Sequence, residues 1–369
     1  MADPTIETFC CHRNAETKES VDLISYFNSD SYNTVCLVSS SIGIVGAIYQ
    51  ILPREKPILS HRWYSDSATR GRRIIVWLAI ADLLASLGVF VRSILWLNYK
   101  SFNLHLTPLS TTAFCALSSA WIQYFYTATW LWTLFYAVDM RLVLREQEGH
   151  PQYYHLIVWV VPAIFTTIGL SILYIPDASC HNINSLSSAL LRILPNYFAN
   201  YLPMATVMVV NPILYLSLSQ DVERLVSRSL AQFTNKERQV VDIIKVKFLL
   251  INMAFYMCWL PNLINSILIW TMWFSLPHNL VVTLWYIMAL MNPLQALFNS
   301  VVYRRWTGVP ERVYFPCRRT NFCDFSMNSS FLSTKPSKPN ESTPLLTRSI
   351  NSSTCASEMQ AREDTDLEY

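Results

Sequence analysis

Seven long apolar segments, separated by shorter stretches that hold nearly all of the charged residues, dominate this chain. They cover residues 34–52, 74–97, 112–138, 155–175, 197–219, 248–270 and 281–303. A helix that spans the bilayer needs about 20 mainly apolar residues, because the hydrocarbon core is about 30 Å thick. The strands of a membrane barrel would instead show segments of about ten alternating residues. The sequence therefore predicts an all-α membrane protein that crosses the bilayer seven times.

Charged residues are almost absent from these segments. Six of them contain no Asp, Glu, Lys or Arg, and the second contains only Asp82 and Arg92. Charged residues make up 14% of the chain, whereas soluble domains carry about a quarter. The core helices of a soluble protein would not give seven nearly charge-free runs of this length. The composition therefore favours a membrane protein over a soluble one.

The Lys and Arg residues outside the segments indicate the orientation. Four lie before the first segment and in the second, fourth and sixth connections, whereas 23 lie in the other connections and the tail. Positive residues are retained on the cytosolic face. We therefore expect a lumenal N-terminal segment (1–33), a seven-helix transmembrane domain (34–303) and a cytosolic, mostly disordered tail (304–369). The first 33 residues have no short apolar core, so the first span is expected to be its own insertion signal.

Four of the nine cysteines lie on the predicted lumenal side: Cys10, Cys11, Cys115 and Cys180. Four cysteines allow three pairings. One pairing joins Cys115, at the start of the third span, to Cys180, in the loop after the fourth, and would hold that loop over the mouth of the bundle. The sequence alone does not select among the pairings.

Polar side chains within the spans are the first candidates for function, because an ionisable group at membrane depth is costly. Asp82 lies near the middle of the second span, and Arg92 lies ten residues further on, about 15 Å along a helix. The two side chains therefore do not pair directly. Arg92 would meet a ligand carboxylate, bind a structural partner in the bundle or extend to the interface. Gln123, in the third span, is a further candidate for ligand contact.

Prolines within the spans mark possible hinges, because each removes a backbone donor and bends the helix. The five are Pro162, Pro203, Pro212, Pro261 and Pro293. Asn292 directly precedes Pro293, and further amide side chains gather in the last two spans. Amide groups that bond between neighbouring helices contribute roughly 1 kcal/mol each. This concentration predicts a polar seam between the last two spans, where the packing could switch.

These features resemble the G-protein-coupled receptors. Cys258-Trp259-Leu260-Pro261 looks like the bend in the sixth span of those receptors, and the run around Asp82 looks like the polar site in their second span. Asp139-Met140-Arg141 ends the third span, where those receptors often carry an acidic residue, Arg and an aromatic residue in direct succession. The intervening Met140 departs from the rhodopsin-like class, as does the absence of Tyr three residues after Pro293.

This resemblance implies a seven-transmembrane helix bundle of the G-protein-coupled receptor type, with its N-terminus lumenal and its C-terminus cytosolic. It implies a disulfide between Cys115 and Cys180 and a G-protein side at Asp139 and Arg141. It also implies a helix switch formed by Trp259, Pro261, Asn292 and Pro293.

A narrower resemblance covers most of the chain. Stretches that resemble the ocular albinism type 1 protein family run in order from residue 8 to about residue 308. Among them are Thr8-Phe9-Cys10-Cys11, Trp121-Ile122-Gln123, Tyr136-Ala137-Val138-Asp139, Tyr201-Leu202-Pro203 and Trp306-Thr307-Gly308. The tail beyond residue 310 matches poorly. The resemblance implies a multi-pass receptor of melanosome and lysosome membranes, with transient passage through the plasma membrane and a role in organelle biogenesis and pigmentation.

The same resemblance implies the partners. They are heterotrimeric G proteins and arrestin on the cytosolic face and a small tyrosine-derived ligand, with L-DOPA the leading candidate, on the lumenal face. The third cytosolic connection contains six Lys and Arg residues. These residues either contact anionic lipid head groups or form the docking surface for the G protein, and both interpretations can hold. No cofactor, metal or nucleic-acid partner is expected.

The tail contains a short pattern that clathrin adaptors recognise. Glu341 is followed by three spacer residues and by Leu345 and Leu346. Adaptors bind such a peptide in an extended form, with a pocket for the leucines and a basic patch for the acid. The pattern predicts sorting to lysosome-related organelles.

An organelle transporter for a small amino-acid-like solute is the alternative function. Transporters favour internal repeats and interrupted helices near the midplane, but the halves of this chain show no clear repeat. An enzyme is not expected, because the chain contains neither a zinc-protease motif nor a serine-hydrolase motif. A receptor needs only a pocket and a movable helix.

Overall fold

The computed structural model describes residues 27–52, 62–98, 108–145, 147, 149–174, 186–228, 235–271 and 277–305. Cys180 and the sorting pattern at Glu341, Leu345 and Leu346 lie outside the described residues, as does the side chain of Cys115. The predicted disulfide and the predicted adaptor signal therefore stay predictions.

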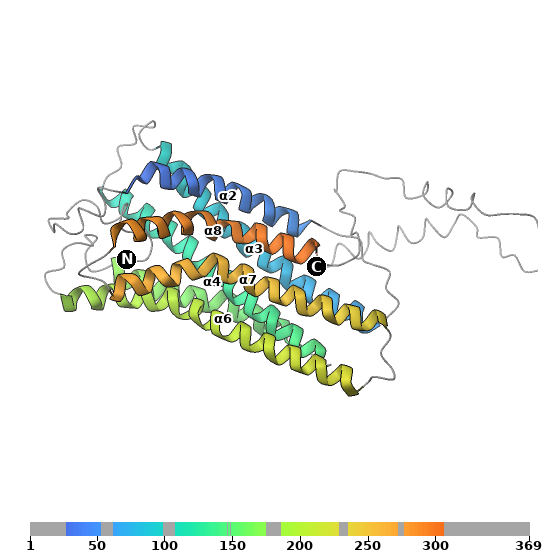
Figure 1. Cartoon of the computed structure of the whole chain (residues 1–369). Helices are drawn as coiled ribbons and strands as arrows, with labels where there is room; N and C mark the ends of the chain where they lie inside the picture. The colour runs from blue at the N-terminus through green and yellow to red at the C-terminus, as the bar shows by residue number, and fades with distance from the viewer. Residues whose placement is uncertain are drawn as a thin grey trace, which may run out of the picture. The chain divides into compact units, whose positions relative to one another are not determined.

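The described residues form seven long helices that run side by side in one bundle (Figure 1). The helices are α2 (Ser29–Ile51), α3 (Arg62–Asn98), α4 (Pro108–Leu144), α5 (Pro151–Tyr174), α6 (Leu186–Arg228), α7 (Asn235–Thr271) and α8 (His278–Arg305). Helix α2 packs against α3 and α8, and α7 packs against α6 and α8. Helix α4 packs against α3, α5 and α6, which makes it the helix around which one side of the bundle is built.

Six of these helices are long and apolar enough to cross a membrane: α2, α3, α5, α6, α7 and α8. The described residues are thus all helical outside short turns and connections, and six of the seven predicted spans correspond to helices that could cross a membrane. Helix α4 has a lower mean hydropathy because it is rich in Trp, Tyr, Ser and Thr. Three of its threonine hydroxyls are satisfied within the helix, since Thr127, Thr129 and Thr133 each donate to a backbone carbonyl one turn earlier. The lower hydropathy of α4 therefore reflects its interior position.

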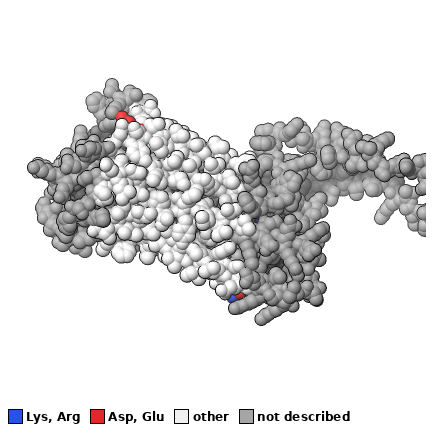
Figure 2. All heavy atoms as spheres, viewed as in Figure 1, with Lys and Arg blue, Asp and Glu red and all other residues white. Residues whose placement is uncertain are grey.

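The bundle places apolar side chains outside and many polar side chains inside. On the face shown in Figure 2, the described residues along the middle of the bundle include no Lys, Arg, Asp or Glu, and the charged residues lie at its two ends. Exposed apolar residues such as Val45, Leu117 and Val209 cover the outer surface. Asn33, Asn265 and Gln295 are buried instead. This distribution suits a bundle surrounded by lipid.

Helices α2 and α8 approach each other closely at two glycines. A Cβ atom added to Gly43 would collide with the carbonyl oxygen of Pro293, and one added to Gly46 would lie 2.7 Å from the Cα atom of Leu297. The Ser39 hydroxyl donates a 2.7 Å hydrogen bond to the backbone carbonyl of Ala289. Small residues of this kind let membrane helices pack backbone to backbone. The close contact fixes the part of α8 that lines the cavity described next.

Candidate ligand-binding site

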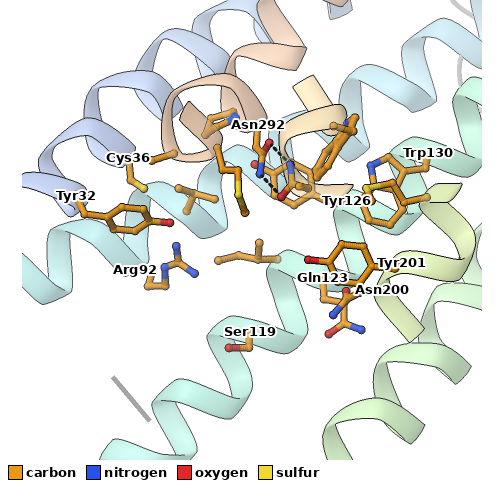
Figure 3. Close-up of a pocket in the computed structure, with 18 residues that line it drawn as sticks. Tyr32, Cys36, Arg92, Ser119, Gln123, Tyr126, Trp130, Asn200, Tyr201 and Asn292 are labelled. Carbon is orange, nitrogen blue, oxygen red and sulfur yellow. Dashed lines mark hydrogen bonds between the residues drawn. The ribbon is translucent and has the colours of Figure 1, made fainter. Parts of the chain in front are cut away.

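A partly open cavity of about 130 Å³ lies among six helices (Figure 3). Its described lining comes from α2, α3, α4, α6, α7 and α8. An engineered apolar cavity of about 150 Å³ holds one benzene molecule. The volume therefore suits a ligand with a single aromatic ring and is too small for a folded peptide.

Three aromatic side chains form one wall of the cavity. The ring centroid of Trp259, from α7, lies 4.9 Å from that of Tyr126 and 4.7 Å from that of Trp130, both from α4. Both contacts are edge-to-face, a favoured geometry for aromatic pairs. The indole N–H of Trp259 donates to the side-chain oxygen of Gln295 on α8. Trp259 therefore joins α4, α7 and α8 at one position.

The predicted intramembrane candidates separate into two places. Arg92 and Gln123 are buried and line the cavity, and Figure 3 shows them reaching it from α3 and α4. Asp82 is buried outside the described lining, where one carboxylate oxygen accepts a 2.9 Å hydrogen bond from the Asn299 amide. Among the lining residues that the structure describes, none is Asp or Glu. The charge that faces the cavity is therefore positive.

A pair of amide side chains links α7 to α8 in the cavity wall. The Asn262 amide donates to the Asn292 oxygen at 2.9 Å, and the Asn292 amide donates back at 3.3 Å. Each asparagine is next to a helix-interior proline, Pro261 or Pro293. The structure thus brings the residues of the predicted helix switch together, and Trp259, Asn292 and Pro293 all line the cavity. Bends at two prolines with a shared amide bridge give these helices a place where their packing can change.

The residues of the predicted G-protein side, Asp139 and Arg141, lie at the end of the bundle where α4 ends and α5 begins; we call this the Asp139 end. They do not pair with each other. The Asp139 carboxylate lies 2.6 Å from the Arg70 guanidinium and accepts a 3.3 Å hydrogen bond from the Tyr154 hydroxyl. The Arg70 guanidinium also donates to the backbone carbonyl of Gln147. Asp139 therefore ties α4 to α3 and α5, and Arg70 extends this contact to the connection between α4 and α5.

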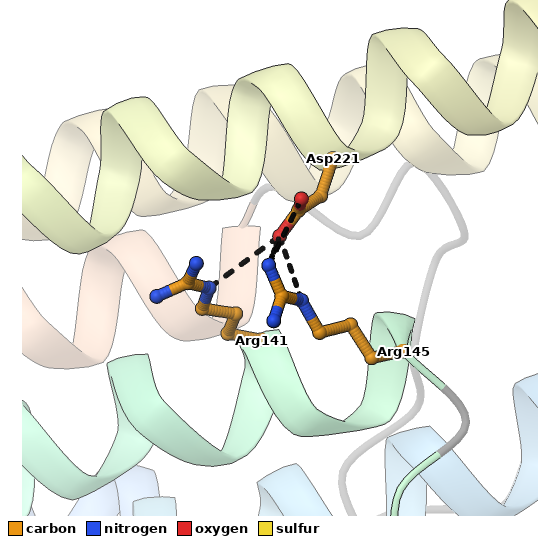
Figure 4. Close-up of polar contacts among 3 residues, drawn as sticks. All are labelled: Arg141, Arg145 and Asp221. Atoms are coloured by element: carbon orange, nitrogen blue, oxygen red, sulfur yellow. Dashed lines mark hydrogen bonds and ion pairs between the residues drawn. The ribbon is translucent and has the colours of Figure 1, made fainter.

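A second ionic contact joins α4 to α6 at the same end (Figure 4). The Arg141 Nε atom lies 3.4 Å and the Arg145 Nη2 atom 2.9 Å from the same oxygen of Asp221. The Asp221 side chain is 15% exposed. The two arginines lie one helical turn apart, so they meet one carboxylate together.

Aromatic rings also connect helices at the Asp139 end. The Phe248 ring on α7 stacks between Tyr215 on α6 and Tyr136 on α4, with centroid distances of 6.0 and 6.3 Å. Tyr136 also makes an edge-to-face contact with Tyr303 on α8 at 5.3 Å. Four helices therefore meet through one aromatic stack. An outward movement of this end of α7 would have to withdraw Phe248 from the stack.

Sequence reasoning missed three polar or aromatic cavity residues on α4, namely Ser119, Tyr126 and Trp130. Together with Gln123 they have spacings of four, three and four residues, which place them on one face of a helix. That spacing was the available signal. The partners Arg70 and Asp221 had no such signal, because they lie 69 and 80 residues from Asp139 and Arg141.

Comparison with known proteins gives matches along most of the chain. A family model described as the ocular albinism type 1 protein matches residues 1–366. The chain is 31% identical over 325 residues to G-protein coupled receptor 143 of Homo sapiens, covering 84% of this chain and 78% of that relative. It is 28% identical over 318 residues to cyclic AMP receptor-like protein A of Dictyostelium discoideum, covering 82% of this chain and 71% of that relative.

Proposed function

Because the chain belongs to the ocular albinism type 1 protein family, we propose that it is a seven-span G-protein-coupled receptor for a small tyrosine-derived molecule such as L-DOPA. Its N-terminus and ligand lie in the lumen of a melanosome or lysosome, and its tail lies in the cytosol. It signals to heterotrimeric G proteins and acts in organelle biogenesis and pigmentation. Two relatives whose names describe receptors support the general class.

The observation that carries the proposal is the single-ring cavity with Arg92 in its wall. The cavity residues come from the beginning of α2, the last third of α3 and the middle of α4. The positions on α2 and α3 lie toward the end of the bundle where the described chain starts. If the N-terminus is lumenal, the cavity belongs to the lumenal half. A buried guanidinium there suits the carboxylate of an amino-acid-like ligand.

The mechanism follows from the contacts on either side of Trp259. A ligand in the cavity lies against Trp259 and against the amide bridge between Asn262 and Asn292. Contact between the ligand and these groups changes the bend of α7 at Pro261. The end of α7 that carries Phe248 then moves outward. Phe248 then leaves the aromatic stack, and a G-protein docking surface opens at the Asp139 end. The ligand favours the open state because it contacts the two states differently.

Nucleotide exchange by a G protein tests this function. The full chain is purified, inserted into lipid vesicles with a heterotrimeric G protein and measured with and without L-DOPA. The proposal predicts faster exchange when L-DOPA is present on the lumenal side. A flat response combined with net uptake of L-DOPA into the vesicles would support the transporter alternative.

Removing the charge at Arg92 is expected to lower the potency of L-DOPA by about a hundredfold. Loss of one partner from a buried, hydrogen-bonded charge pair costs about 2–5 kcal/mol. Arg92→Gln keeps a polar but shorter side chain and removes the charge. Exchange is measured against ligand concentration. Arg73→Gln, an exposed arginine at the other end of α3, is the matched control. Equal potency in the two variants would make Arg92 a structural residue.

Breaking the contact between α4 and α6 is expected to raise exchange without ligand. Asp221→Asn removes the charge that holds both Arg141 and Arg145. Partly exposed pairs contribute little, so the change is about 1 kcal/mol, or roughly fivefold in the closed-to-open ratio. Basal exchange by equal amounts of purified receptor measures the effect. Unchanged or lower basal exchange would show that this contact does not hold the closed state.

The tail and the basic connection complete the proposal. Arrestin and clathrin adaptors bind on the cytosolic side, and the adaptors recognise Glu341, Leu345 and Leu346. Adaptor binding directs the receptor to its organelle after transient passage through the plasma membrane. The six Lys and Arg residues of the predicted third cytosolic connection lie within the last turns of α6 and the first half of α7. These helix ends meet the G protein and the anionic lipid head groups.

A further inference from the structure

One face of α4 carries four polar or aromatic side chains into the cavity. Ser119, Gln123, Tyr126 and Trp130 all line it, and each is at least nine-tenths buried. Their spacing of four, three and four residues forms a single stripe along the helix. We call this stripe the donor face. Gln123 and Trp130 are seven residues apart, or about 10 Å along the axis.

Each of these four side chains has a buried polar atom that finds no hydrogen-bond partner within the described part of the chain. The atoms are the Ser119 hydroxyl, the Gln123 amide nitrogen, the Tyr126 hydroxyl and the Trp130 indole nitrogen. The threonines Thr127 and Thr133 bond to their own helix instead, whereas the indole nitrogen of Trp132, which lies outside the described lining, also has no hydrogen-bond partner among the described residues. Buried polar groups are normally satisfied. The described bundle contains other unpartnered atoms, including the side-chain oxygen of Gln50 and the indole nitrogen of Trp285. These four differ from them because they share one helix face and one cavity, which indicates a group that is bound there.

The chemistry of the donor face defines that group. An amide nitrogen and an indole nitrogen can only donate, and the neighbouring Arg92 guanidinium also only donates. The described lining offers no carboxylate to a ligand's amino group. A ligand that satisfies this face therefore presents acceptors at both ends of a single ring.

We propose that the donor face of α4 binds a ring-hydroxylated aromatic acid, whose carboxylate accepts from Gln123 and whose ring oxygen accepts from Trp130, and that the ligand's amino group is not recognised. The inference rests on the proposed function, since it names the ligand groups read at the same cavity. It assigns to α4 the selectivity that Arg92 alone would not provide.

Binding of three related probes to the full chain in lipid nanodiscs tests the inference by calorimetry. The probes are L-DOPA, its analogue without the amino group, 3-(3,4-dihydroxyphenyl)propanoic acid, and its analogue without the carboxylate, dopamine. We expect the two acids to bind within about threefold of each other and dopamine at least tenfold more weakly. A deamino acid that binds more than tenfold more weakly than L-DOPA would overturn the inference.

Two substitutions test which side chains of the donor face bind the ligand. Gln123→Leu is expected to weaken both acids by about tenfold to a hundredfold, the range for a hydrogen bond to a charged group. Trp130→Phe should weaken the hydroxylated acid but not 3-phenylpropanoic acid, which has no ring oxygen. Gln50→Leu, the same change at a buried residue of α2 outside the described lining, is the control. Unchanged binding in the first two variants would mean that water satisfies the donor face, which would also overturn the inference.

Introducing a negative charge on the donor face distinguishes ligand contact from a structural role. Gln123→Glu should weaken the acids and strengthen dopamine, so that the order of affinity changes. A loss that is equal for all three probes would contradict the assignment.

The probes also separate this inference from the proposed function. Binding of the acids without any effect on nucleotide exchange would leave the inference standing and refute the receptor proposal. Unchanged L-DOPA potency in Gln123→Leu would refute the inference and leave the receptor proposal standing. Binding of no probe would refute the inference.

Discussion

Gly46→Leu is expected to leave almost no folded protein in the membrane. A Cβ atom at this position would lie 2.7 Å from the Cα atom and 2.9 Å from the backbone nitrogen of Leu297. Because the obstacle is backbone, only a separation of α2 from α8 relieves the contact. Overpacking usually costs about 1–3 kcal/mol and more where the backbone must shift. Stabilities of about 5–15 kcal/mol leave little reserve for such a change.

The neighbouring residue provides the control for this substitution. Val45 is 67% exposed on the outer face of α2, so Val45→Leu should leave folding intact. The yield of monodisperse receptor in mild detergent and its thermal midpoint measure the difference. Similar yields and midpoints for the two variants would show that α2 and α8 do not pack as closely as the structure has them.

Gln295→Leu is expected to raise nucleotide exchange without ligand by about tenfold. Gln295 accepts the buried indole N–H of Trp259, and that bond links α7 to α8 in the closed bundle. A buried donor without its acceptor costs about 1–3 kcal/mol. The cost falls on the closed state, so the population shifts toward the open state. Basal exchange per mole of correctly folded receptor measures the shift.

A double-mutant cycle shows whether the effect belongs to this hydrogen bond. Trp259→Phe removes the donor instead of the acceptor and keeps an aromatic ring against Tyr126 and Trp130. The two single variants and the double variant should then show similar basal exchange, because the same bond is absent in all three. Additive effects, or opposite effects of the two single changes, would refute the role given to this bond.

The sequence predicts the helices well because bilayer thickness limits their length. The predicted span 248–270 corresponds to the apolar part Phe248–Leu268 of α7. The helices extend further than the spans, since α3 begins at Arg62, whereas its predicted span begins at residue 74. The extension is polar and leaves no signal in hydropathy. Helix α4 was recognised from its charge-free run, although its aromatic and hydroxyl residues lower its mean hydropathy.

Side-chain pairing was harder to predict than the helices. Asp139 and Arg141 were interpreted as one motif, but two residues apart on a helix they point about 160° away from each other, and each contacts a different helix. Their partners depend on how distant segments pack, and nothing local in the sequence encodes that packing. The amide bridge between Asn262 and Asn292 was foreseen only as a polar seam, because the register between α7 and α8 is set by the whole bundle.

In the proposed mechanism, a ligand in the cavity moves the end of α7 that carries Phe248. Spin labels attached by cysteines at Tyr153 on α5 (63% exposed) and Val246 on α7 (38% exposed) lie at the Asp139 end. Their separation is measured in lipid nanodiscs, in a background without other reactive cysteines. We predict that saturating L-DOPA adds a longer separation, by on the order of 5 Å, the scale of one helical turn. Identical distance distributions with and without bound L-DOPA would contradict the account.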